Sequence, residues 1–367
     1  MTKCLKIGIS GLGVGVDHAL RMEKLNDGII TGMFDPDPSK FEQAVCRSKN
    51  RDQIIRFDSF EHMAFSPEVE VIVIASPNYV HAAQMEICAA AGKPVFLEKP
   101  IGATIAQAQS ICASVKQSGI FCQVGLVYRY SPFFRKVMEL LHSGLIGEIQ
   151  LMYCHEFVDW VWQPDWRNSN ELSGGALVEK NCHHFDIFNW ALRDCVEPLH
   201  VSAFGGRNFY RDREIIDNAS VNVEYANGVR ANLMLCLFSK YTGLEFGFIG
   251  SKGKLICHMD GCEKPRQDSI IFYPKDHMCK DRTVYLVDYD MEFDACKINP
   301  EAIHATNWGH SGNVVEVKEF VECVREGRLP FCTVEIGLAA MRIPAAAELS
   351  IRENRVVTFT GTDHEAL

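Results

Sequence analysis

The chain of 367 residues lacks the signals that mark proteins of membranes or nucleic acids. It has no run of basic residues, and its formal net charge of −10 argues against an anionic partner such as a nucleic acid or a membrane surface. No apolar stretch is long enough to span a bilayer, and no signal peptide is recognisable. We therefore expect a cytoplasmic protein with no nucleic-acid or membrane partner.

The cysteines form neither a disulfide framework nor a zinc pattern. The 15 cysteines are odd in number, scattered, and never spaced Cys-x-x-Cys. Cys88, Cys112, Cys236 and Cys323 lie inside apolar runs, which is typical of small buried hydrophobic residues in a reducing compartment. The sequence therefore predicts no metal site.

The pattern of apolar runs changes near residue 122. Hydrophobic residues make up 47% of the chain and charged residues 23%, as in ordinary globular proteins, and no internal repeat or low-complexity linker is present. Up to residue 122, strand-like runs alternate with helical segments, which is typical of an α/β fold. We expect a Rossmann dinucleotide-binding domain over residues 1–122.

From residue 123 onward, strand-like runs dominate. Several are joined by turns such as Asn227-Gly228, a strong hairpin signal. Helical patterns stand out at about 176–192, 313–326 and 334–352. We expect an α+β domain over residues 123–367, with a large, mostly antiparallel sheet that serves substrate binding and oligomerisation.

A glycine-rich turn follows the first strand-like run, residues 5–10. It contains Gly11, Gly13 and Gly15 and leads into a helical pattern. In a dinucleotide-binding turn, glycines let the backbone approach a pyrophosphate, and the start of the helix binds it. The third glycine of the usual spacing falls on Val16, so Gly15 lies one place early. By itself such a turn is equally typical of a tight loop.

A carboxylate follows the second strand-like run. Asp35 comes roughly 20 residues after the glycines, where such domains bind a ribose 2′-hydroxyl. A carboxylate there also repels a 2′-phosphate, so we expect NAD rather than NADP. Three features in register, a strand, a glycine turn and an acid, favour a cofactor domain over a simple Asp-Pro turn.

The segment Val-Phe-Leu-Glu-Lys-Pro at 95–100 brings a lysine to the end of a strand. The apolar run before it ends in Ser76-Pro77-Asn78, and a helical segment that Gly92 ends leads to residues 95–100. In open α/β sheets, ligands bind outside the carboxyl ends of the strands. Lys99 is therefore expected where cofactor and substrate meet; the alternative is an ordinary surface lysine.

The helical segment at 176–192 carries a second group of polar residues. Its spacing puts Glu179, His183, Asp186 and Trp190 on one face. A carboxylate one turn from an imidazole can orient it and tune its pKa. His184 points about 100° away, so the two histidines have different roles. The alternative is that one histidine belongs to the core and the other is solvated.

Together these segments resemble the Gfo/Idh/MocA family of NAD(P)-dependent oxidoreductases, the relatives of glucose-fructose oxidoreductase and inositol dehydrogenase, over nearly the whole chain. The most specific matches are Glu98-Lys99-Pro100, the Gly-Gly-x-Leu sequence at 174–177, and the Glu179 and His183 pair. Glu179 stands where most members have aspartate.

The resemblance implies roles for individual residues. Lys99 would bind the reacting hydroxyl and help to move its proton, His183 would be the general acid and base, and Glu179 would orient it. Cofactor binding is implied for Gly11, Gly13, Gly15, Val16, Asp35, Ser76, Pro77, Asn78, His81, Glu98, Lys99 and Arg129. Substrate binding is implied for Lys99, Trp166, Arg167, His183 and His184. For Trp160 and Trp162, substrate contact and packing both remain open.

The expected function is therefore NAD-dependent oxidation of a secondary hydroxyl in a sugar, cyclitol or glycoside by hydride transfer. The cofactor carries the hydride chemistry, and the protein supplies position and a proton acceptor, so no metal is required. One alternative is an NAD-retaining glycoside hydrolase or lyase that oxidises its substrate transiently. Another is a non-catalytic NAD-sensing protein. A wide antiparallel sheet also suggests a homodimer or homotetramer.

Overall fold

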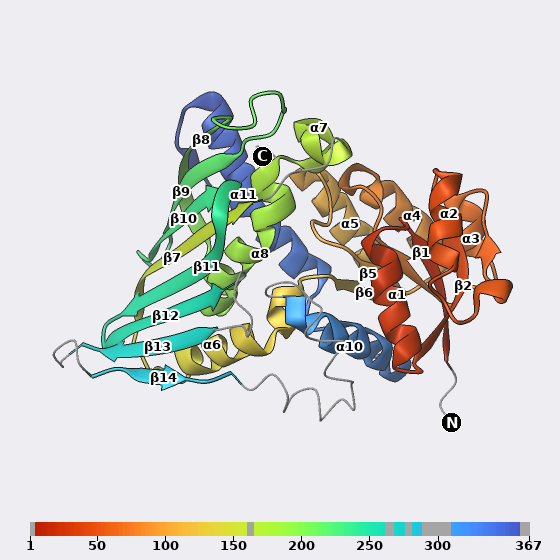
Figure 1. The fold of residues 1–367 in the computed structure, drawn as a ribbon, viewed down its shortest axis with the longest axis horizontal. Helices are drawn as coiled ribbons and strands as arrows, with labels where there is room; N and C mark the ends of the chain where they lie inside the picture. Colours follow the sequence, from red (N-terminus) through yellow and green to blue (C-terminus); the bar gives the residue numbers. More distant parts are fainter. Residues whose placement is uncertain (1–3, 160–164, 261–267, 276–280, 288–309, 360–367) are drawn as a thin grey trace. The chain divides into compact units, whose positions relative to one another are not determined.

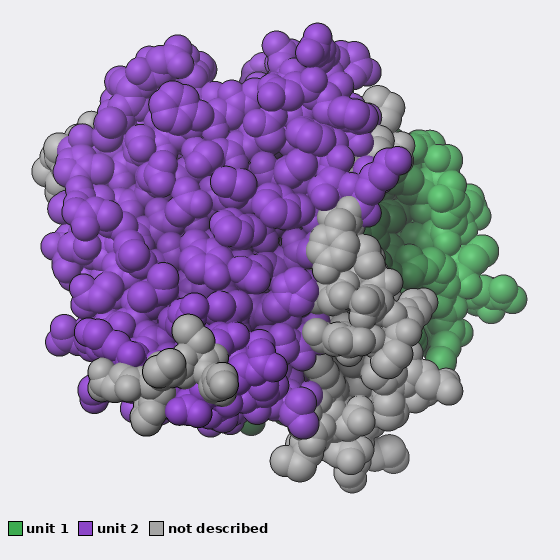
Figure 2. All heavy atoms as spheres, turned by 60° about the vertical axis from the view of Figure 1, so that its left-hand side comes forward, with its two compact units in different colours: residues 1–127, 313–338 green, residues 128–312, 339–367 purple. Residues whose placement is uncertain are grey.

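The computed structural model describes residues 4–159, 165–260, 268–275, 281–287 and 310–359. The chain divides into two compact units, one of residues 1–127 with 313–338 and the other of residues 128–312 with 339–367 (Figure 2). The sequence predicts a single boundary at residue 122, whereas the first unit extends to residue 127 and also includes residues 313–338.

The first unit contains a parallel six-stranded sheet in the order β3-β2-β1-β4-β5-β6 (Figure 1). This is the doubly wound order, in which the direction of winding reverses between β1 and β4, and it confirms the predicted Rossmann fold. The strands are β1 Leu5–Ser10, β2 Gly28–Phe34, β3 Ile55–Arg56, β4 Val71–Ile74, β5 Val95–Leu97 and β6 Cys122–Val124. The helices are α1 Val14–Lys24, α2 Pro38–Val45, α3 Phe60–Phe65, α4 His81–Ala91, α5 Ile105–Ser118 and α10 Asn313–Glu326.

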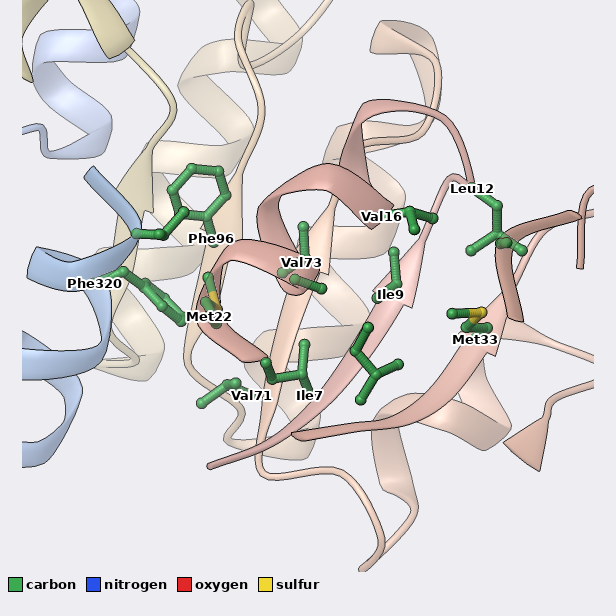
Figure 3. Close-up of a cluster of buried hydrophobic side chains, with 14 of the residues drawn as sticks. Ile7, Ile9, Leu12, Val16, Met22, Met33, Val71, Val73, Phe96 and Phe320 are labelled. Atoms are coloured by element: carbon green, nitrogen blue, oxygen red, sulfur yellow. The ribbon is translucent and has the colours of Figure 1, made fainter. Parts of the chain in front are cut away.

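Helix α10 belongs to the first unit although it lies far along the chain. It runs beside α1 (Figure 1). Its Phe320 ring meets Phe96 of β5 edge to face, with ring centroids 5.7 Å apart, in a cluster that also contains Met22 and Val73 (Figure 3). This helix lies where the sequence predicts it, but in the first unit and not in the second domain, because local periodicity does not show which core an apolar face joins.

The second unit contains a nine-stranded sheet in the order β14-β13-β12-β11-β7-β10-β9-β8-β15. Among the described strand pairs of this nine-stranded sheet, only β10–β7 is parallel, so the sheet is mostly antiparallel, as predicted. The strands are β7 Ile149–Asp159, β8 Pro198–Gly206, β9 Asn218–Tyr225, β10 Arg230–Cys236, β11 Phe238–Gly250, β12 Gly253–Asp260, β13 Ser269–Pro274, β14 Thr283–Tyr285 and β15 Val357–Thr358.

Helices cover one face of this sheet. Phe134 of α6 and Phe188 of α8 both meet Phe246 of β11 edge to face. The helices are α6 Pro132–His142, α7 Asn170–Ser173, α8 Ala176–Ala191 and α11 Val334–Glu353, the last of which begins in the first unit. The predicted helix at about 176–192 is thus confirmed as α8.

Neither a membrane span nor a metal cluster is found among the described residues. Among the described residues, no helix combines the length and the apolar character needed to cross a membrane. Within the same ranges, no three or more His, Cys, Asp or Glu side chains are grouped so as to hold a metal ion.

Candidate cofactor and active site

Gly11 brings the end of β1 against the loop that follows β4. Its φ is +86°, and a Cβ built on it would lie 2.3 Å from the carbonyl oxygen of Ala75. Any side chain at residue 11 would therefore clash with the backbone. The contact lies where the winding of the sheet reverses, which is where dinucleotides bind in this type of fold.

Gly13 and Gly15 have different functions in the glycine loop. Gly13 is the N-cap residue of α1, and a Cβ on it would face open space. A Cβ on Gly15 would lie 2.9 Å from Cβ of Ala75 and 3.1 Å from Cγ2 of Ile9. Gly15 thus provides the close helix-to-strand packing that the third glycine usually provides. The loop fits a pyrophosphate at Gly13 and the start of α1.

The prediction that Val16 contacts the cofactor is wrong. Its side chain is fully buried in the hydrophobic core of the first unit. Its backbone N–H donates to the carbonyl oxygen of Gly13, 3.2 Å away. The physical reason is that α1 already begins at Val14, so residue 16 faces inward.

Asp35 follows β2 and binds the glycine loop. One carboxylate oxygen accepts the backbone N–H of Leu12 and the other that of Asp37, both at 3.0 Å. Lys40 Nζ lies 3.6 Å from Oδ2. Each carboxylate oxygen can accept a second hydrogen bond, so the group still fits a ribose hydroxyl. The contact of Asp35 with the adenosine ribose stays a prediction.

Asp35 is expected to make the protein prefer NADH to NADPH. A 2′-phosphate beside the carboxylate would be repelled, so NADH should bind at least about tenfold more tightly. Asp35→Asn should narrow that difference, because Lys40 then faces the phosphate without a competing carboxylate. Quenching of protein fluorescence gives both dissociation constants. Asp52→Asn, at an exposed position, is the control, and equal binding of both cofactors by the unaltered protein would contradict the assignment.

His81 links two loops at this edge of the sheet. It is fully buried, with Nε2 2.8 Å from the carbonyl oxygen of Ser76 and Nδ1 3.1 Å from that of Pro100. Burial lowers its pKa, while the two carbonyl oxygens act in the opposite direction. Its predicted contact with the cofactor is corrected: the ring has no exposed surface, and it instead holds the Ser76-Pro77-Asn78 loop to the loop that carries Lys99.

Lys99 follows β5, as predicted, and its side chain is partly exposed. Its backbone N–H donates to Oε2 of Glu98 at 2.9 Å, and Oε1 of Glu98 lies 2.5 Å from Nε2 of His18. A role for His18 was not predicted from the sequence. The only available signal was its place one turn into the helix that follows the glycine loop.

In the second unit, two glycines lead into α8. Gly174 and Gly175 have φ values of +89° and +95°. A Cβ on Gly175 would lie 2.5 Å from the carboxyl carbon of Glu348 in α11, and that carboxylate accepts the backbone N–H of Leu177 at 2.8 Å. A side chain from a distant helix thus caps α8, and the Gly-Gly sequence makes room for it.

Glu348 predicts a pH dependence of stability. Burial raises its pKa from the ordinary 4.5 to about 7. Between these values the folded chain holds a proton that the unfolded chain releases, so this group lowers stability as pH rises through that window. Between about pH 5 and about pH 8, the free energy of unfolding of Glu348→Gln should rise by on the order of 1 kcal/mol relative to that of the unaltered protein. Urea unfolding at both pH values measures this, with the exposed Glu353→Gln as control; a gain in the opposite direction would contradict it.

His183 and Glu179 lie on one face of α8, as predicted. The His183 ring is 4% exposed and stacks on Tyr128, with centroids 4.6 Å apart and planes at 15°. Glu179 lies 3.7 Å from Nε of Arg167, which also bonds to Asp165. The structure therefore brings Arg167 to Glu179, and Tyr128 to His183. Tyr128 gave no signal in the sequence.

Trp166 and Arg167 lie together in a short 3₁₀ helix, Trp166–Asn168. The guanidinium carbon of Arg167 lies 4.6 Å from the Trp166 ring centroid. Both side chains are partly exposed, so they remain available to a ligand. Trp160 and Trp162 lie outside the described residues.

His184 faces the sheet, where its ring stacks on Phe246 of β11. That its role differs from that of His183 stays a prediction. The His184 side chain is 1% exposed, and Nε2 lies 3.6 Å from Oε1 of the buried Glu156 on β7. The same carboxylate is bound by Lys180 at 3.0 Å and by the amide of Asn181 at 2.8 Å. Burial alone would raise the pKa of Glu156, but His184 and Lys180 have the larger effect, so the pKa is lowered overall. The predicted substrate contact of His184 is corrected to a place in this buried cluster.

Arg129 does not have the environment of a cofactor ligand. It is 1% exposed and forms bidentate bonds to Asp186, at 2.8 and 2.7 Å, and to Asp194, at 2.9 and 2.7 Å. Its guanidinium carbon also lies 5.4 Å from the centroid of the Trp190 ring. The predicted cofactor contact is therefore corrected to a structural one, because this charge is neutralised inside the second unit.

Comparisons with known proteins agree with this geometry. The model of an oxidoreductase family with an NAD-binding Rossmann fold matches residues 5–126, and the GFO/IDH/MocA C-terminal domain matches residues 134–256. The putative oxidoreductase YteT of Bacillus subtilis is 31% identical over 189 residues, which are 49% of this chain and 43% of YteT. The chain thus spans less than half of that relative's length.

Two other similarities run along nearly the whole chain. Myo-inositol 2-dehydrogenase of Thermotoga maritima is 22% identical over 96% of this chain and 98% of its own. The structure of a levoglucosan dehydrogenase in complex with NADH covers 98% of this chain and 100% of its own, with a TM-score of 0.82 and 18% identity. That structure supports the fold.

Proposed function

Because this chain belongs to the Gfo/Idh/MocA family of NAD-binding oxidoreductases, we propose that it oxidises a secondary hydroxyl of a sugar, cyclitol or glycoside. The observation that carries the proposal is Lys99, a partly exposed lysine at the carboxyl end of β5, in a unit whose glycine loop and Asp35 suit NAD. The relatives named for inositol and levoglucosan oxidation support a hydroxylated ring as substrate.

The cofactor would be held by residues of the first unit. Gly13 and the first turn of α1 suit the pyrophosphate, and Asp35 suits the adenosine ribose. Cofactor contacts of the loop at 76–78, of Glu98 and of Lys99 stay predictions. NAD, when bound, supplies the carbon that accepts the hydride.

The reaction also requires removal of a proton from the hydroxyl. We assign Lys99 to the hydroxyl oxygen, where its ammonium group stabilises the negative charge that develops as the proton leaves. We assign His183 to the proton itself, since an imidazole titrates near neutral pH. Stacking on Tyr128 limits how the His183 ring can turn, and Glu179 lies one helical turn away.

The charges of the second unit favour a neutral substrate. Arg167 lies beside Asp165 and Glu179, and Lys180 lies beside Glu156. A cation that is already paired with a carboxylate attracts an anionic substrate less strongly. Trp166 offers an aromatic ring of the kind that stacks on the apolar face of a sugar or cyclitol.

A substrate panel tests the proposal. Inositols, aldoses and aryl glycosides are incubated with the protein and NAD, and absorbance at about 340 nm is followed, since the proposed net oxidation yields one NADH per product. We expect at least one neutral polyol to give a continuous rise.

The same panel in deuterium oxide distinguishes the alternatives. Aglycone release with deuterium in the sugar and no net NADH would indicate transient oxidation followed by elimination. NADH binding without turnover of any compound would favour a sensor. Either outcome would contradict the proposed net oxidation.

A further inference from the structure

We propose that His18 is a positioning residue for Lys99 and acts through the carboxylate of Glu98. The inference rests on the proposed function, because it assumes that Lys99 contacts the reacting hydroxyl. It concerns the first unit alone.

The carboxylate of Glu98 is bound at both oxygens. Nε2 of His18, from α1, lies 2.5 Å from Oε1, and the backbone N–H of Lys99 donates to Oε2 at 2.9 Å. The backbone N–H of Glu98 donates to the carbonyl oxygen of Ile74 in β4 at 2.8 Å. One carboxylate therefore connects the helix behind the glycine loop to the backbone of the proposed catalytic lysine.

The surroundings leave the imidazole and the carboxylate little freedom. The His18 side chain is 2% exposed, and its ring lies 4.8 Å from that of Phe96, centroid to centroid. Phe96 is in turn packed against Phe320 of α10. A Cβ built on Gly125 would lie 3.4 Å from the carboxyl carbon of Glu98. The carboxylate is thus enclosed from the β6 side as well.

Several titratable groups of the first unit surround Glu98. His18 and Arg21 face the cluster from α1, Lys99 follows in the chain, and Glu316 faces it from α10. Burial raises the pKa of Glu98, but His18 and Lys99 outweigh it and lower the pKa overall. Burial and the nearby Glu98 raise the pKa of Glu316 well above its ordinary value, so Glu316 is favoured in its neutral form.

The consequence concerns the placement of Lys99 rather than cofactor binding. Without the imidazole N–H, the enclosed carboxylate loses a strong bond and can turn away from the Lys99 amide. The backbone at Lys99 is then held less firmly, so the position of its ammonium group varies more. A displacement of a reacting group by about 1 Å can reduce a reaction rate about 100-fold. The Asp35 carboxylate is bound by the backbone N–H groups of Leu12 and Asp37, so its position does not depend on His18 and NAD binding should be retained.

Two substitutions separate the hydrogen bond from packing. His18→Phe keeps a ring against Phe96 but has no N–H, whereas His18→Gln keeps an N–H donor near the position of Nε2. We expect His18→Phe to lower kcat by about 10- to 100-fold, with the KM and the Kd for NADH within about threefold of the unaltered protein, and His18→Gln to recover most of the loss. His62→Phe, at an exposed position in α3, is the matched control.

A second measurement does not need a substrate. Hydrogen exchange at the Lys99 amide, followed by mass spectrometry of the peptide that contains it, should be faster in His18→Phe than in His18→Gln or the control. If His18→Phe does not fold, Glu98→Gln takes its place, and it should show intermediate exchange because it keeps an acceptor without the charge.

The possible outcomes separate this inference from the proposed function. Normal kcat and normal exchange in His18→Phe, with an inactive Lys99→Ala, would overturn the inference alone. An equal loss of kcat in His18→Phe and His18→Gln would mean that His18 acts only through packing, and it would also overturn the inference. An active Lys99→Ala would instead overturn the proposed role of Lys99.

Discussion

Replacing His183 or Lys99 with alanine is expected to lower turnover by at least about 100-fold, the lower end for a positioned acid or base group. Each variant removes a group assigned to the hydroxyl and its proton, so the effect should appear in kcat measured with the substrate found in the panel. The Kd for NADH should be retained in His183→Ala, because the residues assigned to the cofactor lie in the first unit.

His184→Ala is the matched control for the first prediction. His184 lies beside Glu156, Lys180 and Asn181 in the buried cluster, so its loss should affect stability more than turnover. A variant pair in which His184→Ala is inactive and His183→Ala is active would contradict the assignment of the two histidines.

Arg129→Met is expected to lower the free energy of unfolding by about 3–5 kcal/mol, the range for removing one partner of a buried ion pair. The methionine fills similar space but leaves Asp186, which is 1% exposed, without its cation. Burial raises the pKa of Asp186, and Arg129 opposes that effect, so the variant should take up a proton at this carboxyl. Urea unfolding, followed by circular dichroism, measures the loss.

Arg230→Met provides the control in the same unit. The Arg230–Glu224 pair has a 2.7 Å contact but a 64% exposed arginine, so its loss should change stability by less than about 1 kcal/mol. Arg129→Met should also leave the Kd for NADH unchanged. Normal stability with weakened NADH binding would restore the original prediction that Arg129 contacts the cofactor.

The sequence alone predicted those parts of the protein that depend on neighbours within a few residues. Alternating strands and helices, Asp35 after β2 and Lys99 after β5 all follow from local periodicity and from the order of elements. The bounds of α8 were predicted almost to the residue, because the Gly174-Gly175 pair marks its start and one face carries Glu179 and His183.

The tertiary structure decided how deeply each predicted site residue is buried. Val16, His81, Arg129 and His184 each have suitable chemistry or a suitable place in the chain, but all four are almost fully buried. Burial depends on what packs against a residue, and local pattern does not contain that information. The early start of α1 placed Val16 in the core and gave Gly15 the packing role expected one residue later.

The tertiary structure also decided the contacts between residues that lie far apart in the chain. His18 reaches Glu98, Phe320 joins the core of the first unit, and Glu348 caps α8. In each contact the two partners belong to different elements, so no spacing within one segment encodes it. The sequence thus determined the two folds and the positions of Lys99 and His183, while long-range packing determined which residues hold them in place.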